Sequence, residues 1–231
     1  MIRHITYCSE NMTISARKCS ESALKYGCDT STVYTYEDLN KFFRLVTTSI
    51  LLCERGAGYW VWKPQIIQQE MNKGEDGDVI IYTDAGVDFV NDVHHLINAM
   101  DQDVMVFGGQ YNHREWCKGD VLKHTDIKQL QASCILVNFL YGYNKVVDIW
   151  QENTMNKQLI DDSPSIKPNH PDFREHRHDQ AILTEVCADY GIRSHWWPAT
   201  YLEGKFNYPK LDHTDTYPVI FHHHRRRNDE W

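Results

Sequence analysis

Asp84 follows a short apolar run in a context that suits the binding of a diphosphate. Val79-Ile80-Ile81-Tyr82 lie just before it, and the small residues Ala85 and Gly86 follow it. A carboxylate with little bulk beside it suits a divalent cation on a diphosphate, because Mg²⁺ and Mn²⁺ prefer oxygen ligands and often share them with substrate phosphates. Aspartate also commonly caps a turn. The local pattern leaves both roles open.

A second group of ionisable side chains occupies residues 174–183, where the sequence becomes apolar within one helical turn. A helix that starts here would present the carboxylate of Asp179 and the amide of Gln180 to a sugar, while Ile182, Leu183 and Val186 hold it on the core. The alternative is a solvated, charged helix start.

The third group is Val219 to Asn228, a strand-like run that ends in His222-His223-His224 and Arg225-Arg226-Arg227. Imidazole is a good ligand for Mn²⁺, and guanidinium pairs with phosphate oxygens through two hydrogen bonds. Together these residues fit a metal diphosphate. A solvated basic tail is the other interpretation, and the native-looking residues that follow argue against a tag.

Aromatic residues accompany two further candidate contacts. Gly56 to Pro64 combines glycines, which allow close backbone approach, with tryptophans and with Lys63, which could reach an anionic donor. Trp196 and Trp197 follow an expected strand and would form an acceptor platform. For the tryptophans of both segments, packing in the core remains an alternative.

Alternating periodicity predicts the elements that position these groups. Strands are expected at residues 2–7, 32–36, 79–82, 104–107, 133–138 and 192–195. Helices are expected at residues 12–26, 36–53, 62–72, 91–100, 143–156 and 176–190. This order is typical of a doubly wound α/β sheet, whose ligands bind beyond the carboxyl ends of the strands. Asp84 is expected at that edge, and residues 161–172 or 199–215 could cover it.

Composition limits the class of protein. A chain of 231 residues favours one domain, and no run approaches the roughly 18 apolar residues of a membrane span. The net charge of −8 argues against nucleic-acid binding. We expect a cytoplasmic protein without a signal peptide, in which the seven scattered cysteines stay reduced.

Four segments together resemble a known family. They are Gly58-Tyr59-Trp60-Val61-Trp62-Lys63-Pro64, Gly77-Asp78-Val79-Ile80-Ile81-Tyr82-Thr83-Asp84-Ala85-Gly86, His178-Asp179-Gln180 and His222-His223-His224-Arg225-Arg226-Arg227-Asn228. Their order and spacing resemble small GT-A nucleotide-sugar glycosyltransferases, including enzymes of surface and capsid glycan assembly in bacteria and large DNA viruses. The resemblance implies one Rossmann-like domain over residues 1–231, with a mixed, mostly parallel sheet flanked by helices.

The resemblance also implies an activity, which is metal-assisted transfer of a sugar from a nucleoside diphosphate, commonly UDP, to a glycan or other hydroxyl acceptor. Asp84 stands at the first acidic position of the DXD motif, which holds the metal and the nucleotide. Gly86 stands at the second acidic position, a departure for which Asp88 is the candidate substitute. His222 or His223 is implied as a further ligand of Mn²⁺ or Mg²⁺.

The remaining roles follow from the same resemblance. Lys63, Ala85 and Gly86 would contact the donor, and Arg225 or Arg226 would contact its diphosphate. Asp179 would act as general base if the reaction inverts the anomeric centre. If it retains configuration, Asp179 and Gln180 would stabilise an oxocarbenium-like sugar.

Three other functions are alternatives to sugar transfer. A non-catalytic carbohydrate-binding or scaffold protein would explain the tryptophans and the missing second aspartate. A nicotinamide oxidoreductase is disfavoured because Cys8-Ser9-Glu10-Asn11, and no G-x-G-x-x-G, follows the first strand. A zinc hydrolase built from His176, His178 and residues 222–224 lacks a recognised ligand spacing.

Overall fold

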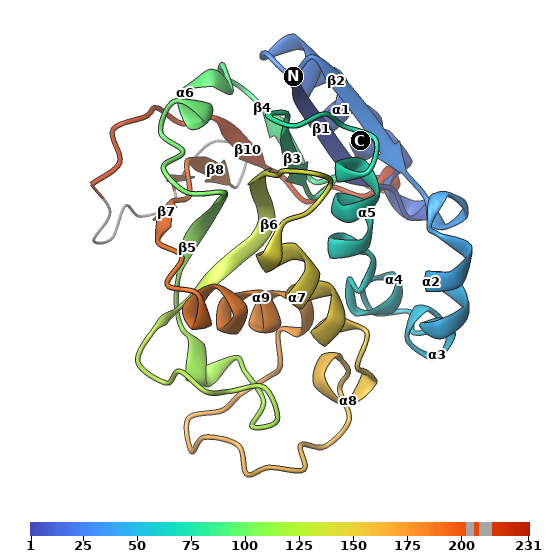
Figure 1. Cartoon of the computed structure of the whole chain (residues 1–231), viewed down its shortest axis with the longest axis vertical. Coiled ribbons are helices and arrows are strands. Elements are labelled where there is room, and N and C mark those ends of the chain that lie inside the picture. The colour runs from blue at the N-terminus through green and yellow to red at the C-terminus, as the bar shows by residue number, and fades with distance from the viewer. Residues whose placement is uncertain (202–205, 208–213) are drawn as a thin grey trace.

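A computed structural model describes residues 1–201, 206–207 and 214–231, and for residues 206–207 the backbone alone (Figure 1). Its strands are β1 (Ile2–Tyr7), β2 (Thr30–Tyr34), β3 (Val79–Thr83), β4 (Val87–Phe89), β5 (Val104–Asn112), β6 (Lys128–Asn138), β7 (Ser194–Trp196), β8 (Ala199–Tyr201), β9 (Phe206–Asn207) and β10 (Phe221–His223). Its α-helices are α1 (Thr13–Lys25), α2 (Lys41–Val46), α3 (Thr48–Leu51), α4 (Gly56–Tyr59), α5 (Trp62–Met71), α6 (His94–Ile97), α7 (Lys145–Thr154), α8 (Lys157–Ile160) and α9 (His178–Asp189).

The central sheet has the strand order β2-β1-β3-β6-β5-β7. β1 pairs in parallel with β2 and with β3, and β5 pairs in parallel with β7. β6 is antiparallel to both of its neighbours, β3 and β5. The predicted mixed, mostly parallel α/β sheet is therefore confirmed, with one reversed strand at its centre.

Each face of this sheet carries its own core, because successive side chains of a strand point to opposite faces. On one face Ile80 and Tyr82 of β3 pack with α5, α7 and α9. On the other face Ile81 packs with residues of β4, β8 and β10. Both faces are apolar, which explains why residues 79–82 of β3 and residues 134–137 of β6 read as continuous apolar runs.

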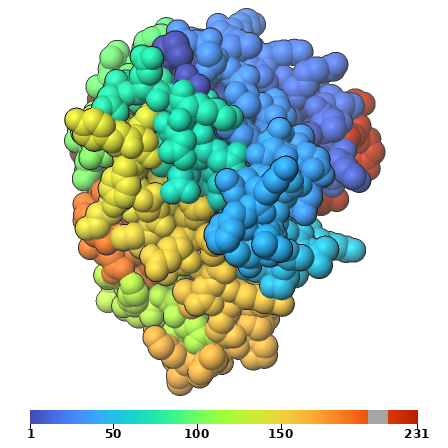
Figure 2. All heavy atoms as spheres, turned by 45° about the vertical axis from the view of Figure 1, so that its right-hand side comes forward, coloured from blue at the N-terminus to red at the C-terminus, as the bar shows by residue number. Residues whose placement is uncertain are grey.

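A second sheet, with the order β4-β10-β8-β9, lies behind the central one in Figure 1. β10 is antiparallel to β4 and parallel to β8, and it therefore brings residues near the end of the sequence beside the segment after β3. Figure 2 shows these last residues in red against the blue N-terminal segment. The Ser15 hydroxyl donates to the carbonyl oxygen of Arg226, and the Trp231 indole donates to Ser15 Oγ at 2.9 Å.

Several predicted elements differ from the structure. The expected helix 36–53 is broken, because the side chain of Asn40 accepts hydrogen bonds from the amides of Phe42 and Phe43 and starts α2 there. The expected helix 91–100 is reduced to the single turn α6. The second sheet was not predicted, because its strands have two or three residues each and show no readable alternation.

The two segments proposed as covers have different outcomes. Within residues 161–172, the amides of Ile166 and Lys167 donate to Asp120, and Asn169 accepts from Gly119. None of that segment lines the pocket described below. The other proposed cover, 199–215, falls largely outside the described residues. In the part of the chain that the structure describes, the helices are too short and too polar to cross a bilayer.

Candidate active site

A pocket of about 470 Å³ opens beyond the carboxyl ends of β1 and β3. This is the edge at which open α/β sheets bind their ligands. Its lining residues come from six stretches of the chain, within 7–12, 54–63, 84–86, 132–133, 177–180 and 223–227. Since β6 runs in reverse, it reaches this edge with Ala132 and Ser133, and the amide of Asp84 donates to the carbonyl of Ser133 at 2.9 Å.

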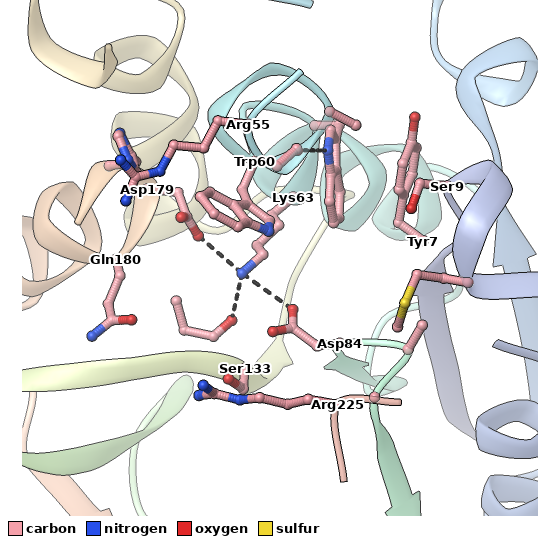
Figure 3. Close-up of a pocket in the computed structure, with 18 of the residues that line it drawn as sticks. Tyr7, Ser9, Arg55, Trp60, Lys63, Asp84, Ser133, Asp179, Gln180 and Arg225 are labelled. Carbon is pink, nitrogen blue, oxygen red and sulfur yellow. Dashed lines mark hydrogen bonds and ion pairs between the residues drawn. The ribbon is translucent and has the colours of Figure 1, made fainter. Parts of the chain in front are cut away.

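Lys63 lies at the centre of the pocket and joins three of its walls (Figure 3). Its Nζ is 3.2 Å from Asp84 Oδ1 and 3.1 Å from Asp179 Oδ2, and it donates to the carbonyl of Ala132 at 3.0 Å. Only 3% of the lysine is exposed. A buried ammonium needs such partners, because an uncompensated charge is costly inside a protein.

The first turn of α5 fixes the position of Lys63. Pro64 suits this turn, since its missing N–H would have had no helical partner. Trp62 stacks on Tyr7 at the end of β1, with ring centroids 3.9 Å apart. The Trp62 indole also donates to the carbonyl of Gly56 at 3.1 Å. Trp62 therefore joins the helix, the first strand and the glycine-rich segment.

The charges of this group follow from its contacts. Burial alone would lower the pKa of Lys63, but the carboxylates of Asp179 and Asp84 more than offset it and raise that pKa. Burial would raise the pKa of Asp84, but the Lys63 ammonium and the Tyr82 hydroxyl outweigh it and lower that pKa. Lys63 is therefore protonated and Asp84 ionised at neutral pH.

Asp179 differs from Asp84 in its protonation. Burial and the nearby Asp84 carboxylate raise the pKa of Asp179 to about 7, despite the opposing effect of Lys63. The Trp150 indole donates to the backbone carbonyl of Asp179 at 2.9 Å and fixes this end of α9. A carboxyl that titrates near neutrality in a pocket is suited to acid–base or charge-stabilising work. Gln180 lines the pocket beside it.

Backbone strain is concentrated around the same pocket. Among the described residues, six other than glycine have positive φ, a region that L-residues seldom adopt. Four of them line the pocket, namely Ala57 (φ 49°), Trp60 (61°), His178 (47°) and Arg225 (59°). Such strain of about 1–3 kcal/mol per residue persists where the surroundings fix it, often at functional sites.

The C-terminal residues divide between the pocket and the rest of the molecule. His223 lines the pocket, whereas His222 lies on the opposite face of β10 and pairs through Nδ1 with Thr200 Oγ1 at 3.0 Å. Arg225 lines the pocket, but Arg226 does not, and its guanidinium lies 4.9 Å from the Trp231 ring. Strand alternation separates the two histidines, whereas the two arginines lie beyond the end of β10.

Trp196 and Trp197 lie in the core rather than in the pocket. They are 7% and 1% exposed. Trp196 stacks on Tyr217, and Trp197 stacks on Phe221. The placement of both rings corrects the expectation of an acceptor platform, because neither face is open to a sugar.

Three solved structures of known enzymes have this architecture. Mouse xyloside xylosyltransferase 1 aligns with a TM-score of 0.52 and 13% identity, over 96% of each chain. The galactosyltransferase LgtC, solved with donor and acceptor sugar analogues, gives a TM-score of 0.55 and 12% identity over 97% of this chain and 87% of LgtC. The bifunctional glycosyltransferase WbbM gives 0.52 and 11% over 87% of this chain and 40% of WbbM. This chain has the GT-A glycosyltransferase fold. No family model and no curated protein sequence matches it.

Several residues of the GT-A pocket were missed by the sequence analysis. They include Tyr7 at the end of β1, Ser9 and Asn11 after it, Arg55 before α4, Ser133 in β6, and Arg177 before α9. The end of β1 could have been found, because parallel neighbours such as β1 and β3 finish at the same edge of a sheet. Ser133 could not, since nothing in its local pattern shows that β6 is antiparallel.

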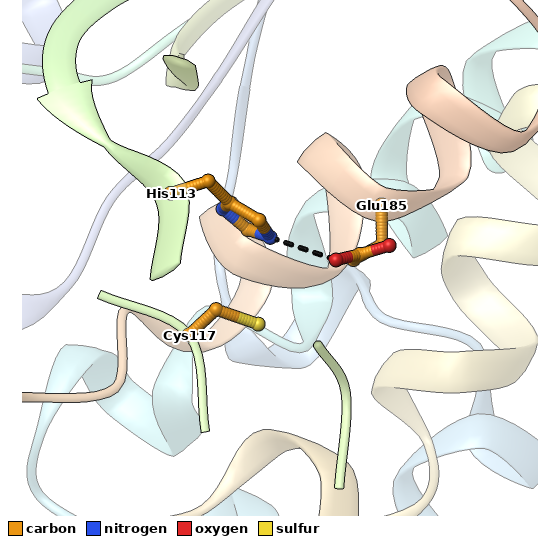
Figure 4. A group of neighbouring side chains, drawn as sticks. All are labelled: His113, Cys117 and Glu185. Carbon is orange, nitrogen blue, oxygen red and sulfur yellow. Dashed lines mark hydrogen bonds and ion pairs between the residues drawn. The ribbon is translucent and has the colours of Figure 1, made fainter. Parts of the chain in front are cut away.

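A second polar cluster lies away from the GT-A pocket and consists of His113, Cys117 and Glu185 (Figure 4). Their ligand atoms lie within 4.8 Å of one another, so they are possible metal ligands. Glu185 already accepts hydrogen bonds from His113 Nε2 at 3.1 Å and from the amides of Lys123 and His124 at 2.8 and 3.1 Å. This network accounts for the buried carboxylate and ties residues 113–124 to α9.

Proposed function

We propose that this chain is a glycosyltransferase that moves a sugar from a nucleoside diphosphate, with UDP as the first candidate, to a hydroxyl acceptor. The observation that carries the proposal is the pocket itself. Five of its lining side chains are cationic (Arg55, Lys63, Arg177, Arg225 and Arg227) and three are acidic (Glu54, Asp84 and Asp179), although the whole chain has a net charge of −8. A cationic pocket in an acidic protein favours an anionic ligand.

The GT-A fold supports the same function, because its solved neighbours are a xylosyltransferase and a galactosyltransferase. In our proposal the donor diphosphate lies along the Arg225 side of the pocket and the sugar lies toward Asp179 and Gln180. The ionised carboxylate of Asp179 then either accepts the proton of the acceptor hydroxyl or stabilises positive charge on the sugar. Both roles require Asp179 to be ionised.

Of the ligands predicted for Mn²⁺ or Mg²⁺, Asp84 and His223 line this pocket and His222 does not. Such ions are usually held by several oxygen ligands. Asp84 Oδ1 is already bonded to Lys63 and Tyr82, and His223 Nε2 accepts a hydrogen bond from Arg225 Nε at 3.1 Å. This donor set does not fit a divalent cation well, so we derive no catalytic step through one.

The proposal is tested by donor binding and turnover. UDP, GDP, ADP and CDP and their common sugar conjugates are screened by thermal shift, since a ligand of the folded state raises the melting temperature. Release of nucleotide from the best donor is then followed with and without hydroxyl acceptors. The proposal predicts binding of at least one nucleotide sugar and slow hydrolysis or transfer; binding of free glycans without any nucleotide binding would support the scaffold alternative instead.

A further inference from the structure

The two candidate metal ligands of the pocket already have partners within the protein. Asp84 is the acidic residue of the β3–β4 turn that lines the pocket, and Lys63 and Tyr82 both contact its Oδ1. The imidazole of His223 is held through Nε2 by Arg225. A divalent cation that took Asp84 Oδ1 and His223 Nε2 as its ligands would have to displace both the lysine and the arginine.

Gly86 cannot be replaced by a second acidic ligand without moving the backbone. A Cβ atom built on Gly86 would lie 2.8 Å from Arg225 Cα and 3.1 Å from Arg225 N, closer than such contacts occur. The amides of His224 and Arg225 both donate to the carbonyl of Gly86, at 2.9 and 3.2 Å. The missing second aspartate is therefore a requirement of how the C-terminal segment packs here.

Asp88 does not replace that aspartate. It lies in β4 directly opposite His222 of β10, and its Oδ1 is 3.5 Å from His224 Nε2. It does not line the pocket. The carboxylate proposed from the sequence as a substitute ligand is therefore directed to His224, just after the neighbouring strand β10.

Two guanidiniums of the C-terminal segment line the pocket, and Arg225 is the one that packs against Gly86. The two are those of Arg225 and Arg227, and both residues are exposed. Throughout the described residues neither has a carboxylate within ion-pair distance, whereas Arg55 is paired with Asp162 and Glu175. In Figure 3 the guanidinium of Arg225 lies beside Ser133, below Asp84 and Lys63. Guanidinium binds phosphate oxygens in pairs and carries a permanent charge.

We propose that Arg225 and Arg227, together with the ammonium of Lys63, bind the donor diphosphate in the place that a divalent cation would otherwise occupy. The inference rests on the proposed function, since it assigns the diphosphate of that same donor. It predicts a glycosyltransferase that binds its nucleotide and turns over in the presence of a chelator. The positive charge that neutralises the leaving diphosphate then comes from side chains of the protein.

The test measures the dissociation constant of the best nucleoside diphosphate from the thermal-shift panel, by calorimetry, in EDTA and in Mn²⁺. We expect the two constants to agree within about threefold. Arg225→Gln should weaken binding by about 10- to 100-fold, as expected for lost charge-assisted hydrogen bonds. The dissociation constant of Arg225→Lys should lie between those of the parent and Arg225→Gln. Lysine keeps the positive charge but cannot donate the two parallel hydrogen bonds of a guanidinium. Binding of the free nucleoside should not change.

Arg17→Gln on α1 is the matched control, because its guanidinium is exposed, does not line the pocket and pairs, among the described residues, with Glu21. Unchanged melting temperatures would show that the Arg225 variants fold, as expected for an exposed side chain. Binding that disappears in EDTA and returns with Mn²⁺ overturns the inference and leaves the transferase proposal standing. No binding of any nucleoside diphosphate under either condition overturns both.

Discussion

Nζ of Lys63 lies 3.1 Å from Oδ2 of Asp179, and the side chain of each is 4% exposed. This pair links α5 to the first turn of α9, two elements that the sequence separates widely. It holds a carboxyl with a raised pKa against a permanent cation in the wall of an open pocket. Removing the carboxylate of Asp179 and removing the ammonium of Lys63 are therefore expected to have different effects.

Asp179→Asn removes the charge of that carboxyl and keeps its size. We expect the turnover rate with the best donor to fall by about 10²- to 10⁴-fold, the usual range for loss of a positioned acid or base. The dissociation constant for the nucleoside diphosphate should change little, because Asp179 lies on the sugar side of the proposed binding mode. Asp126→Asn, at an exposed carboxylate, is the control. Equal turnover in both variants would contradict the proposed role.

The pH dependence of turnover follows from the pKa of about 7 of Asp179. The active form is the ionised one, so the rate should be low near pH 5, rise with pH through about 7, and level off above it. Asp179→Asn should remove this rise from any residual activity. Initial rates in buffers of constant ionic strength test the prediction, and a rate that falls across this interval would contradict it.

Lys63→Met removes the cation that the buried carboxyl of Asp179 shares with the half-buried carboxylate of Asp84. We expect a loss of about 3–5 kcal/mol in the free energy of unfolding, the usual result of breaking a buried ion pair from one side. The loss should be smaller at about pH 5, where protonated Asp179 no longer needs a partner. Urea denaturation at the two pH values measures both effects. The control is Lys157→Met, at an exposed lysine, and a loss no larger than in that control would show that the pair contributes little.

Glu185→Gln tests the second cluster as a structural tie. Although burial acts to raise it, the pKa of Glu185 is lowered to about 2 by hydrogen bonds from His113, Lys123 and His124. A lowered carboxyl pKa gives stability that is full above the unfolded value of about 4.3 and is lost as pH falls toward 2. The variant should therefore lose roughly 2–4 kcal/mol at pH 7.

At pH 2.5 the difference between Glu185→Gln and the parent should be much smaller. Thermal unfolding across this pH range is the measurement, and Glu152→Gln, at an exposed site, is the control. Zinc bound in stoichiometric amount by the parent and absent from the variant would show that the cluster is a metal site, contrary to the hydrogen-bond account.

Ala57→Gly tests the strain at the pocket. Ala57 has φ 49° and ψ 51°, a left-handed conformation that costs an alanine about 1 kcal/mol and a glycine almost nothing. We expect the variant to be more stable by about 0.5–1 kcal/mol. Ala188→Gly, in the regular helix α9, should instead destabilise by a similar amount. Chemical denaturation measures the change in the free energy of unfolding, which should have opposite signs in the two variants.

Much of this arrangement could be predicted from strand order and residue type. Lys63, Asp84, Asp179 and Gln180 were identified from local patterns, and the structure brings all four to one pocket. The reversed direction of β6 could not be predicted, because its two apolar faces read the same in either direction.

The C-terminal segment shows a second limit of the sequence. The pattern there could not separate His222 from His223, since the choice depends on which face of β10 meets the pocket. The contact between Gly86 and Arg225 could not be predicted from the sequence either. It depends on a pairing between β4 and β10, two strands of three residues each.

The distribution of the pocket along the chain has a consequence for folding. Tyr7 and Arg225 line the same cavity, and Gly86, which also lines it, packs directly against Arg225. Contacts between distant parts of a chain form slowly, because loop closure must precede them. During synthesis the pocket cannot be complete until residues 223–227 have left the ribosome. Shorter nascent chains therefore lack this wall, and cleavage before residue 223 would remove it.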